Sequence, residues 1–267
     1  MISVFSAQAN DRTPRASPFE EWLGALEERH LARLHFSEVR RAAQALSCTF
    51  VERRERIPIG ALRGAGKRAA FALFYGPLHF LLVRNVVRAL EAAAPAPRSI
   101  LDLGCGTGAA GAAWALEVDG RPAITAVDRS RWAVEETRWT FRQLGLKGRA
   151  VAGDVTRASL PGAGGTILAA FTVNELEALT RERLLKRLLA AAHRGARVLI
   201  VEPIARRATP WWGGWSEAFE RAGGRADDWR FPARLPERLK LLDRAAGLDH
   251  RELTARSLWL PHGSQET

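Results

Sequence analysis

A glycine-rich segment, Asp-Leu-Gly-Cys-Gly-Thr-Gly at residues 102–108, carries the clearest chemical signal in the sequence. It follows a short apolar run at 99–103 and precedes a helix-forming run at 108–118. Glycines at such a junction let the backbone turn tightly and approach a ligand without a Cβ clash. A helix that begins there offers free N–H groups and the positive end of its dipole. We therefore predict a ligand crevice lined by Asp102, Gly104, Cys105, Gly106 and Gly108.

The acid before the first glycine indicates the class of ligand. Gly106, Gly108 and Gly111 also fit the dinucleotide pattern GxGxxG, which is weak evidence by itself. The Asp102 carboxylate would repel a pyrophosphate and attract an ammonium group. S-adenosylmethionine carries an ammonium group beside a sulfonium and an adenosine. We therefore predict it as the cofactor and rank a nicotinamide dinucleotide well below it.

Two further acids follow the next two predicted strands. Asp128 ends the second strand, where a carboxylate can accept both ribose hydroxyls, and Asp154 ends the third, where it can accept the adenine amino group. Arg129 and Val155, which follow these acids, complete this part of the predicted cofactor site. In the competing interpretation, Asp128 and Asp154 cap turns or helices, a common role of aspartate.

Residues after the fourth predicted strand are candidates for contact with the methyl acceptor. Asn174 can accept a hydrogen bond from a substrate amine or hydroxyl, and Glu175 can act as a base. The alternative is that one of them caps the next helix. Tyr75, the single tyrosine, either closes over the cofactor or is a packed aromatic. For Phe171 we favour a place in the sheet core over an adenine platform.

Alternating strands and helices must position these residues. Five apolar strands separated by helices are typical of a parallel sheet covered on both faces. The predicted strands are 99–103, 123–128, 149–154, 166–173 and 196–203, with a sixth possible within 248–260. The predicted helices of this region are 108–118, 131–145, 177–193 and 236–247, with a loop at 207–215 followed by a helix to about Ala222.

We predict that the chain divides into a disordered tail at 1–18, a helical basic lobe at 19–98 and a cofactor-binding domain at 99–267. The longest apolar stretch, Ala69 to Val83, is shorter than a membrane span and is interrupted by Gly76-Pro77, so we expect no membrane association. Two cysteines provide no disulfide framework and no metal or iron–sulfur ligand set. We expect a reducing, cytoplasmic location in a bacterium, and rank the mitochondrial matrix lower.

The charge is strongly positive, with 40 basic and 29 acidic residues and a net charge of +11. Residues 1–98 hold fifteen of the basic and nine of the acidic residues. An anionic partner such as RNA or a ribonucleoprotein fits this arginine-rich composition, because guanidinium groups bind phosphates. A GC-rich genome explains the bias equally well. The phosphate-contact candidates are Arg40-Arg41, Arg53-Arg54-Arg56 and Arg63-Lys67-Arg68, with Trp211, Trp212 and Trp215 as candidates for base stacking.

The segment LDLGCGTG, followed at these spacings by VD and GD, resembles the class I S-adenosylmethionine-dependent methyltransferases. The resemblance covers residues 99–203. It implies an α/β, Rossmann-like fold, a parallel sheet with helices on both faces, here preceded by a helical N-terminal lobe. The family's sheet has seven strands, the last antiparallel. Only six candidate strands are visible, so we expect a missing, shortened or rearranged final strand.

A narrower resemblance lies largely outside this core. Residues 45–54, 66–90, 171–179 and 199–203 are similar to the ribosomal small-subunit methyltransferase-like family of bacteria and mitochondria. That family places a helical, RNA-associated segment before its methyltransferase core. No cysteine follows Cys105, and Ile204 replaces the glycine that usually follows Glu-Pro, so an iron–sulfur cluster is not expected.

The leading hypothesis is thus a methyltransferase that acts on RNA or on the ribosomal small subunit. One alternative is a non-catalytic ribosome-assembly factor that binds S-adenosylmethionine and rRNA. The other is a methyltransferase for a small molecule or a protein, with incidental basic charge.

Overall fold

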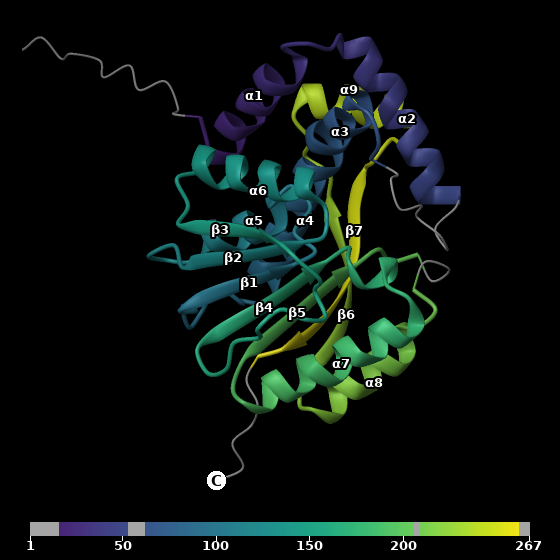
Figure 1. Ribbon diagram of the computed structural model, residues 1–267. Helices are drawn as coiled ribbons and strands as arrows, with labels where there is room; N and C mark the ends of the chain where they lie inside the picture. The colour runs from purple at the N-terminus through teal and green to yellow at the C-terminus, as the bar shows by residue number, and fades with distance from the viewer. Residues whose placement is uncertain (1–15, 53–61, 206–208, 262–267) are drawn as a thin grey trace, which may run out of the picture.

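The computed structural model describes residues 16–52, 62–205 and 209–261, with a seven-stranded sheet at its centre (Figure 1). The strand order is β3-β2-β1-β4-β5-β7-β6. The first five strands in this order run parallel: β1 (Ser99–Leu103), β2 (Ala123–Asp128), β3 (Gly148–Ala152), β4 (Gly165–Ala170) and β5 (Arg197–Glu202). This arrangement confirms the predicted α/β sheet and brings the carboxyl ends of β1, β2 and β4 to one edge.

We expected the final strand to be missing, shortened or rearranged, but the sheet has all seven strands. β7 (Glu252–Leu260) runs antiparallel to β5, and β6 (Arg225–Pro232) runs antiparallel to β7. β6 was not predicted from the sequence. Its side chains are exposed or only partly buried, as an edge strand allows, so it has no continuous apolar run.

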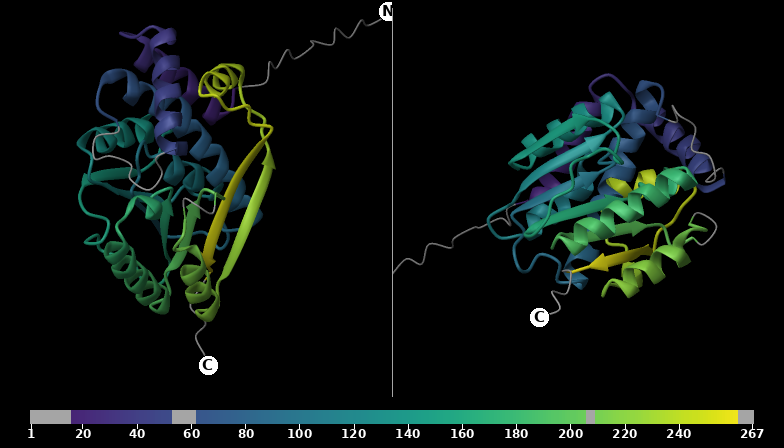
Figure 2. Two further views of the ribbon diagram at one scale, coloured as in Figure 1. Left: turned by 90° about the vertical axis from the view of Figure 1, so that its right-hand side faces the viewer. Right: turned by 60° about the horizontal axis from the view of Figure 1, so that its bottom comes forward.

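Helices cover both faces of the sheet. α7 (Ala178–His193) and α8 (Trp212–Arg221) lie on one face, as Figure 2 shows. α8 begins inside the loop predicted at 207–215. The other face packs against α4 (Gly76–Ala89), α5 (Ala109–Glu117) and α6 (Arg131–Gln143). α9 (Glu237–Ala245) packs on the N-terminal helices and belongs to the same apolar cluster. Apolar side chains of the sheet are therefore buried on both sides.

The N-terminal lobe consists of helices, as predicted. They are α1 (Pro18–Leu31), α2 (Phe36–Glu52), α3 (Ala65–Ala70), the π-helix η1 (Phe71–Tyr75) and α4 (Gly76–Ala89). The expected interruption at Gly76-Pro77 is wrong, because the helix continues through the π turn, where the Gly76 N–H bonds to the Phe71 carbonyl. Most of the tail predicted at 1–18 lies outside the described residues.

One helical stretch, Ala65–Ala89, is long and apolar enough to cross a membrane by length and composition. In the fold, 72% of its most apolar window is buried. α4 packs against α5 on the sheet. This stretch is therefore a core helix of the kind found in soluble proteins.

Candidate active site

The glycine loop joins the carboxyl end of β1 to α5. The backbone N–H groups of Gly104 and Cys105 both donate to the Val127 carbonyl of β2, at 2.8 and 3.2 Å. Gly104 and Gly108 have φ angles of +71° and +76°, and a Cβ on Gly104 would lie 2.3 Å from Thr172 atoms. These positions therefore require glycine, as the sequence predicts.

Asp128 lies at the carboxyl end of β2, directly beside this loop. Its Oδ2 accepts the Gly106 N–H at 3.0 Å, and its Oδ1 accepts the Ser130 N–H at 2.8 Å. The side chain is partly exposed, and burial is the main cause of its raised pKa. A carboxylate has about four acceptor positions, so two remain for further donors such as sugar hydroxyls.

Asp102 lies beneath the loop and is 1% exposed. Its Oδ2 accepts the N–H of Gly111 in α5 at 3.1 Å. Burial raises the pKa of Asp102 to about 7, against the effect of the Gly111 hydrogen bond and with a contribution from the Asp128 charge. Asp102 therefore connects the end of β1 to the first turn of α5 by a hydrogen bond, and its carboxyl group lies close to the glycine loop.

The remaining predicted residues of this group, Arg129, Asp154 and Val155, follow the ends of β2 and β3. Asp154 is two residues beyond β3 rather than at its end, and its Oδ1 accepts the backbone N–H and the hydroxyl of Thr156. This is the turn-capping geometry of the competing interpretation. Val155 is buried in the core. Arg129 is exposed, and its charge lowers the pKa values of Asp128, Asp154 and Glu175.

Aromatic side chains of the N-terminal lobe face the glycine loop. A Cβ on Gly106 would lie 3.6 Å from the Phe71 ring, and one on Gly76 would lie 2.9 Å from Thr107 Oγ1. The Tyr75 ring lies 5.8 Å from that of Phe71 and 5.0 Å from that of Phe74. The π turn therefore brings Tyr75 to the loop as part of an aromatic cluster. Single π turns are frequent at functional sites.

A stacked pair of rings, His79 and Phe171, extends this cluster. Their centroids are 4.0 Å apart and their planes differ by 16°. Phe171 follows β4, is partly exposed and has a φ of +56°, a strained backbone conformation for a bulky residue. Phe171 packs against the core from a position just beyond β4, so it has the expected core contact but lies at the end of the sheet rather than within it. Burial lowers the pKa of His79 to about 3, so the imidazole is neutral.

The predicted acceptor-side residues lie on the turn after β4. The Glu175 side chain is exposed, although much of the protein lies around its carboxyl group. These surroundings raise its pKa to about 7, with Arg129 opposing and Asp128 reinforcing the shift. The charges of Asp128 and Arg129, at the end of β2, therefore influence the ionisation of Glu175 on this turn. Asn174 is partly buried, and its Oδ1 has no hydrogen-bond partner among the described residues.

Sequence reasoning missed Glu202, the last residue of β5. It is fully buried, and its Oε1 accepts the backbone N–H groups of Val173 at 2.7 Å and Asn174 at 3.3 Å. Burial raises the pKa of Glu202 to about 8. The sequence signal that could have identified Glu202 is an acidic residue at the end of the apolar segment LIVEP, residues 199–203.

Cys105 and the tryptophans have structural roles. Cys105 is buried beside the Thr137 hydroxyl at 3.3 Å, and burial raises its pKa well above the ordinary value, so it is a neutral thiol. Trp212 and Trp215 are buried against the sheet with Phe219 rather than open for base stacking. Within the described ranges, no three His, Cys, Asp or Glu residues gather as metal ligands.

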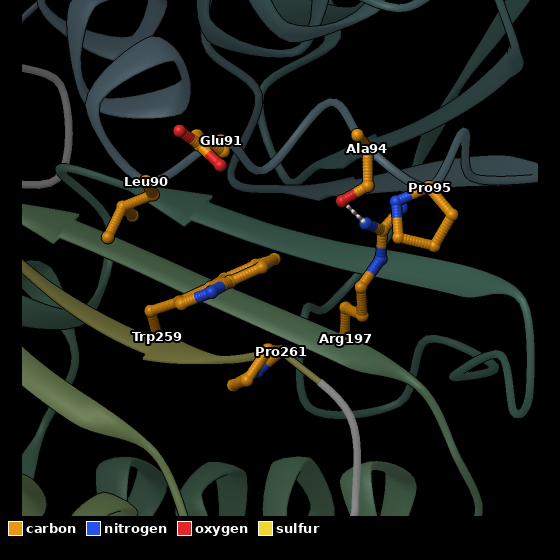
Figure 3. Close-up of a pocket in the computed structure, with 7 residues that line it drawn as sticks. All are labelled: Leu90, Glu91, Ala94, Pro95, Arg197, Trp259 and Pro261. Carbon is orange, nitrogen blue, oxygen red and sulfur yellow. Dashed lines mark hydrogen bonds between the residues drawn. The ribbon is translucent and has the colours of Figure 1, made fainter.

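A cavity of about 230 Å³ lies at the opposite edge of the sheet (Figure 3). It is lined by residues that include Glu91, Arg197 and Trp259, and the buried Arg197 donates to the Ala92 and Ala94 carbonyls at 3.2 and 3.3 Å. Arg197 begins β5, whereas the glycine loop follows the end of β1. The cavity is therefore separate from the candidate active site.

The residues present fit S-adenosylmethionine. The glycines form a loop that side chains cannot occupy, Asp128 retains acceptor positions for ribose hydroxyls, and the buried Asp102 charge favours a cationic ligand. All three features lie at the carboxyl edge of the parallel strands, where ligands of such sheets bind.

Comparisons with known proteins agree with this geometry. Residues 100–197 match a family model described as a methyltransferase domain. A solved structure of a candidate O-methyltransferase from Nostoc punctiforme superposes with a TM-score of 0.52 at 14% identity, covering 91% of this chain and 72% of that one. A candidate class I S-adenosylmethionine-dependent methyltransferase from Listeria monocytogenes gives 0.50 at 12% identity, covering 94% and 89%. A comparison with curated proteins finds no match.

Residues 100–197 therefore match a methyltransferase domain, and the chain has the fold of class I methyltransferases. The match concerns the general methyltransferase domain. The narrower resemblance to the ribosomal small-subunit methyltransferase-like family therefore stays a prediction.

Proposed function

We propose that the protein transfers the methyl group of S-adenosylmethionine to a base of RNA, within the ribosomal small subunit or a precursor of it. The observation that carries this proposal is the His79–Phe171 stack, which lies where β4 ends and where Asn174 and Glu175 follow. Aromatic and imidazole rings at a crevice are typical platforms for unpaired bases. The partly exposed pair offers an uncharged, planar surface of this kind.

The adjacent turn supplies the chemistry that a base acceptor needs. Bound S-adenosylmethionine supplies an already activated methyl group, so the protein has mainly to align a nucleophile and exclude water. Asn174 Oδ1 accepts a hydrogen bond from the acceptor amine or hydroxyl. The Glu175 carboxylate would accept the proton that the acceptor atom loses on methylation. A pKa of about 7 makes Glu175 an effective base near neutrality.

The cofactor side follows the predicted order. We assign the ribose hydroxyls to Asp128, the methionine ammonium to the field of Asp102, and the adenine amino group to Asp154 at the rim. The Phe71 ring lies against Gly106 and stacks with Tyr75, so we assign to both rings the task of shielding the cofactor from water. We place the activity in the cytoplasm, a reducing compartment in which the free cysteines Cys48 and Cys105 stay reduced.

The test is methyl transfer from radiolabelled S-adenosylmethionine to immature small-subunit rRNA by the full chain. We expect label in the RNA, and His79→Ala should raise the KM for RNA about tenfold through lost stacking, while cofactor affinity stays unchanged. His193→Ala, on an exposed helix end, is the matched control. Label in small molecules or protein but not RNA would contradict the RNA acceptor. Cofactor and rRNA binding without transfer would instead identify an assembly factor.

A further inference from the structure

A groove of about 440 Å³ lies between α2 and α9. These helices are nearly 200 residues apart in the chain but lie side by side, as Figure 1 shows at the top of the molecule. The groove is lined by Ser37, Arg40, Arg41, Gln44, Arg244 and Ala245. It therefore has three guanidinium groups, two neutral polar side chains and no carboxylate in its lining.

The acids on the two helices whose side chains the structure describes do not pair with these arginines. On α2, Glu38 accepts the His35 backbone N–H at 2.8 Å. On α9, Glu237 pairs with Lys240, and Asp243 holds the His250 ring and backbone N–H. Among the described residues, Arg40, Arg41 and Arg244 have no salt-bridge partner, and all three are exposed. The groove therefore keeps its full positive charge.

The position of the groove relates it to the active site. α2 and α9 both contact η1, the π turn whose Phe71 faces Gly106 of the glycine loop. A chain that lies in the groove is thus held beside the element that covers the cofactor crevice. An extended polymer with regularly spaced negative charges fits this arrangement, because each guanidinium group can form a bidentate contact with one phosphate.

We infer that the groove between α2 and α9 binds the sugar–phosphate backbone of the RNA substrate, with Arg40, Arg41 and Arg244 on successive or neighbouring phosphates. This inference rests on the proposed RNA function. It adds Arg244 to the basic residues of the N-terminal lobe. Binding at this groove positions the strand and carries no sequence readout, since phosphates are alike in every sequence.

The experiment compares the full chain with the variant Arg40→Ala/Arg41→Ala/Arg244→Ala. The probe is a fluorescein-labelled single-stranded RNA of about 20 nucleotides, titrated at several salt concentrations and followed by fluorescence anisotropy. Loss of three phosphate contacts should weaken binding at least tenfold at low salt. It should also reduce the slope of log affinity against log salt by about 2.

A charge-matched control removes three cations from the other end of the molecule. It is Arg183→Ala/Lys186→Ala/Arg194→Ala, on α7 and its C-terminal cap, where all three side chains are exposed. We expect this control to change RNA affinity less than about threefold. If the two variants lose equal RNA affinity, or if the unmodified chain does not bind RNA at low salt, the inference that the groove binds RNA is wrong. Poly-L-glutamate that competes as well as RNA would point to an acidic protein instead and would also overturn it.

Two further readouts separate the groove from the proposed activity. Calorimetric affinity for S-adenosylmethionine should be unchanged in the groove variant, which shows that the fold and crevice are intact. If RNA binding depends on the three arginines but no RNA is methylated, the groove is an RNA-binding site and RNA is not the methyl acceptor. If the groove variant methylates RNA as well as the unmodified chain does, RNA is the acceptor and the groove does not bind it.

Discussion

The buried carboxylate of Glu202 accepts the backbone N–H of Asn174 at 3.3 Å, which ties the end of β5 to the turn that follows β4. The same oxygen accepts the Val173 N–H at 2.7 Å. Two donors that the turn would otherwise leave unpaired are thus held by one side chain. Because Asn174 and Glu175 share this turn, Glu202 fixes where both candidate catalytic side chains stand.

Glu202 is therefore a positioning residue, and its acceptor oxygen should matter more than its charge. Glu202→Ala leaves two buried N–H groups unpaired, and we expect kcat for RNA methylation to fall about tenfold or more. Glu202→Gln keeps an acceptor oxygen, and it is neutral as Glu202 is at pH 7, so we expect near-normal kcat. Steady-state kinetics with small-subunit rRNA measure both. If the glutamine variant is as slow as the alanine variant, the hydrogen bond is not what Glu202 contributes.

Much of the fold follows from local sequence signals. The apolar runs that become β1, β2 and β5 sit between helices of clear periodicity, so the parallel half of the sheet was predictable. β6 was not, because its residues RADDWRFP alternate between exposed and half-buried positions and form an edge. The continuity of helix through Gly76-Pro77 was hidden as well, since it depends on a π turn.

The candidate site divides in the same way. Asp102, Asp128 and the glycines were predictable because they stand at strand ends within a short segment of chain. The role of Glu202 depends on pairing with Asn174, 28 residues earlier. Arg244 joins Arg40 only through the packing of α9 on α2. Such long-range contacts leave no local pattern.

Asp128 should dominate cofactor affinity. Asp128→Ala removes the acceptor assigned to the ribose hydroxyls and the brace on the Gly106 N–H, and we expect S-adenosylmethionine affinity to fall about a hundredfold. Isothermal titration calorimetry measures this change. Asp119→Ala, an exposed acid in the loop before β2, is the matched control and should bind normally. Unchanged affinity in the Asp128 variant would remove the ribose assignment.

Cofactor affinity should also depend on pH through Asp102. With its pKa raised to about 7 by burial, Asp102 is largely neutral at pH 6 and largely charged at pH 8. Its negative charge favours the methionine ammonium, so affinity should rise about tenfold from pH 6 to pH 8. Calorimetry at both pH values checks this.

Two variants assign the pH effect to its source. Asp102→Asn keeps an acceptor for the Gly111 N–H but cannot ionise, so its affinity should be low and nearly independent of pH. Glu175→Gln removes the other group with a pKa of about 7 and should retain the pH dependence. The opposite pattern would transfer the effect from Asp102 to Glu175.

The stability of the protein should fall as the pH rises from 5 to 8. The pKa of Glu202 is raised in the folded state to about 8, against 4.5 as its ordinary value, so the folded state binds more protons than the unfolded state across this range. By linkage, the free energy of unfolding then decreases with increasing pH, by up to about 1.4 kcal/mol per pH unit for one such group. Asp102 and Glu175 act in the same direction below pH 7, because the pKa of each is raised to about 7. His79 opposes them up to about pH 6.5, because its pKa is lowered from 6.5 to about 3 in the folded state. Urea denaturation at pH 5, 6, 7 and 8 measures the trend.

Glu202→Gln removes the contribution of Glu202, so its unfolding free energy should vary less with pH than that of the unmodified chain, above all between pH 7 and pH 8. A variant curve as steep as the original would mean that Glu202 does not lose its proton within this range in the folded protein.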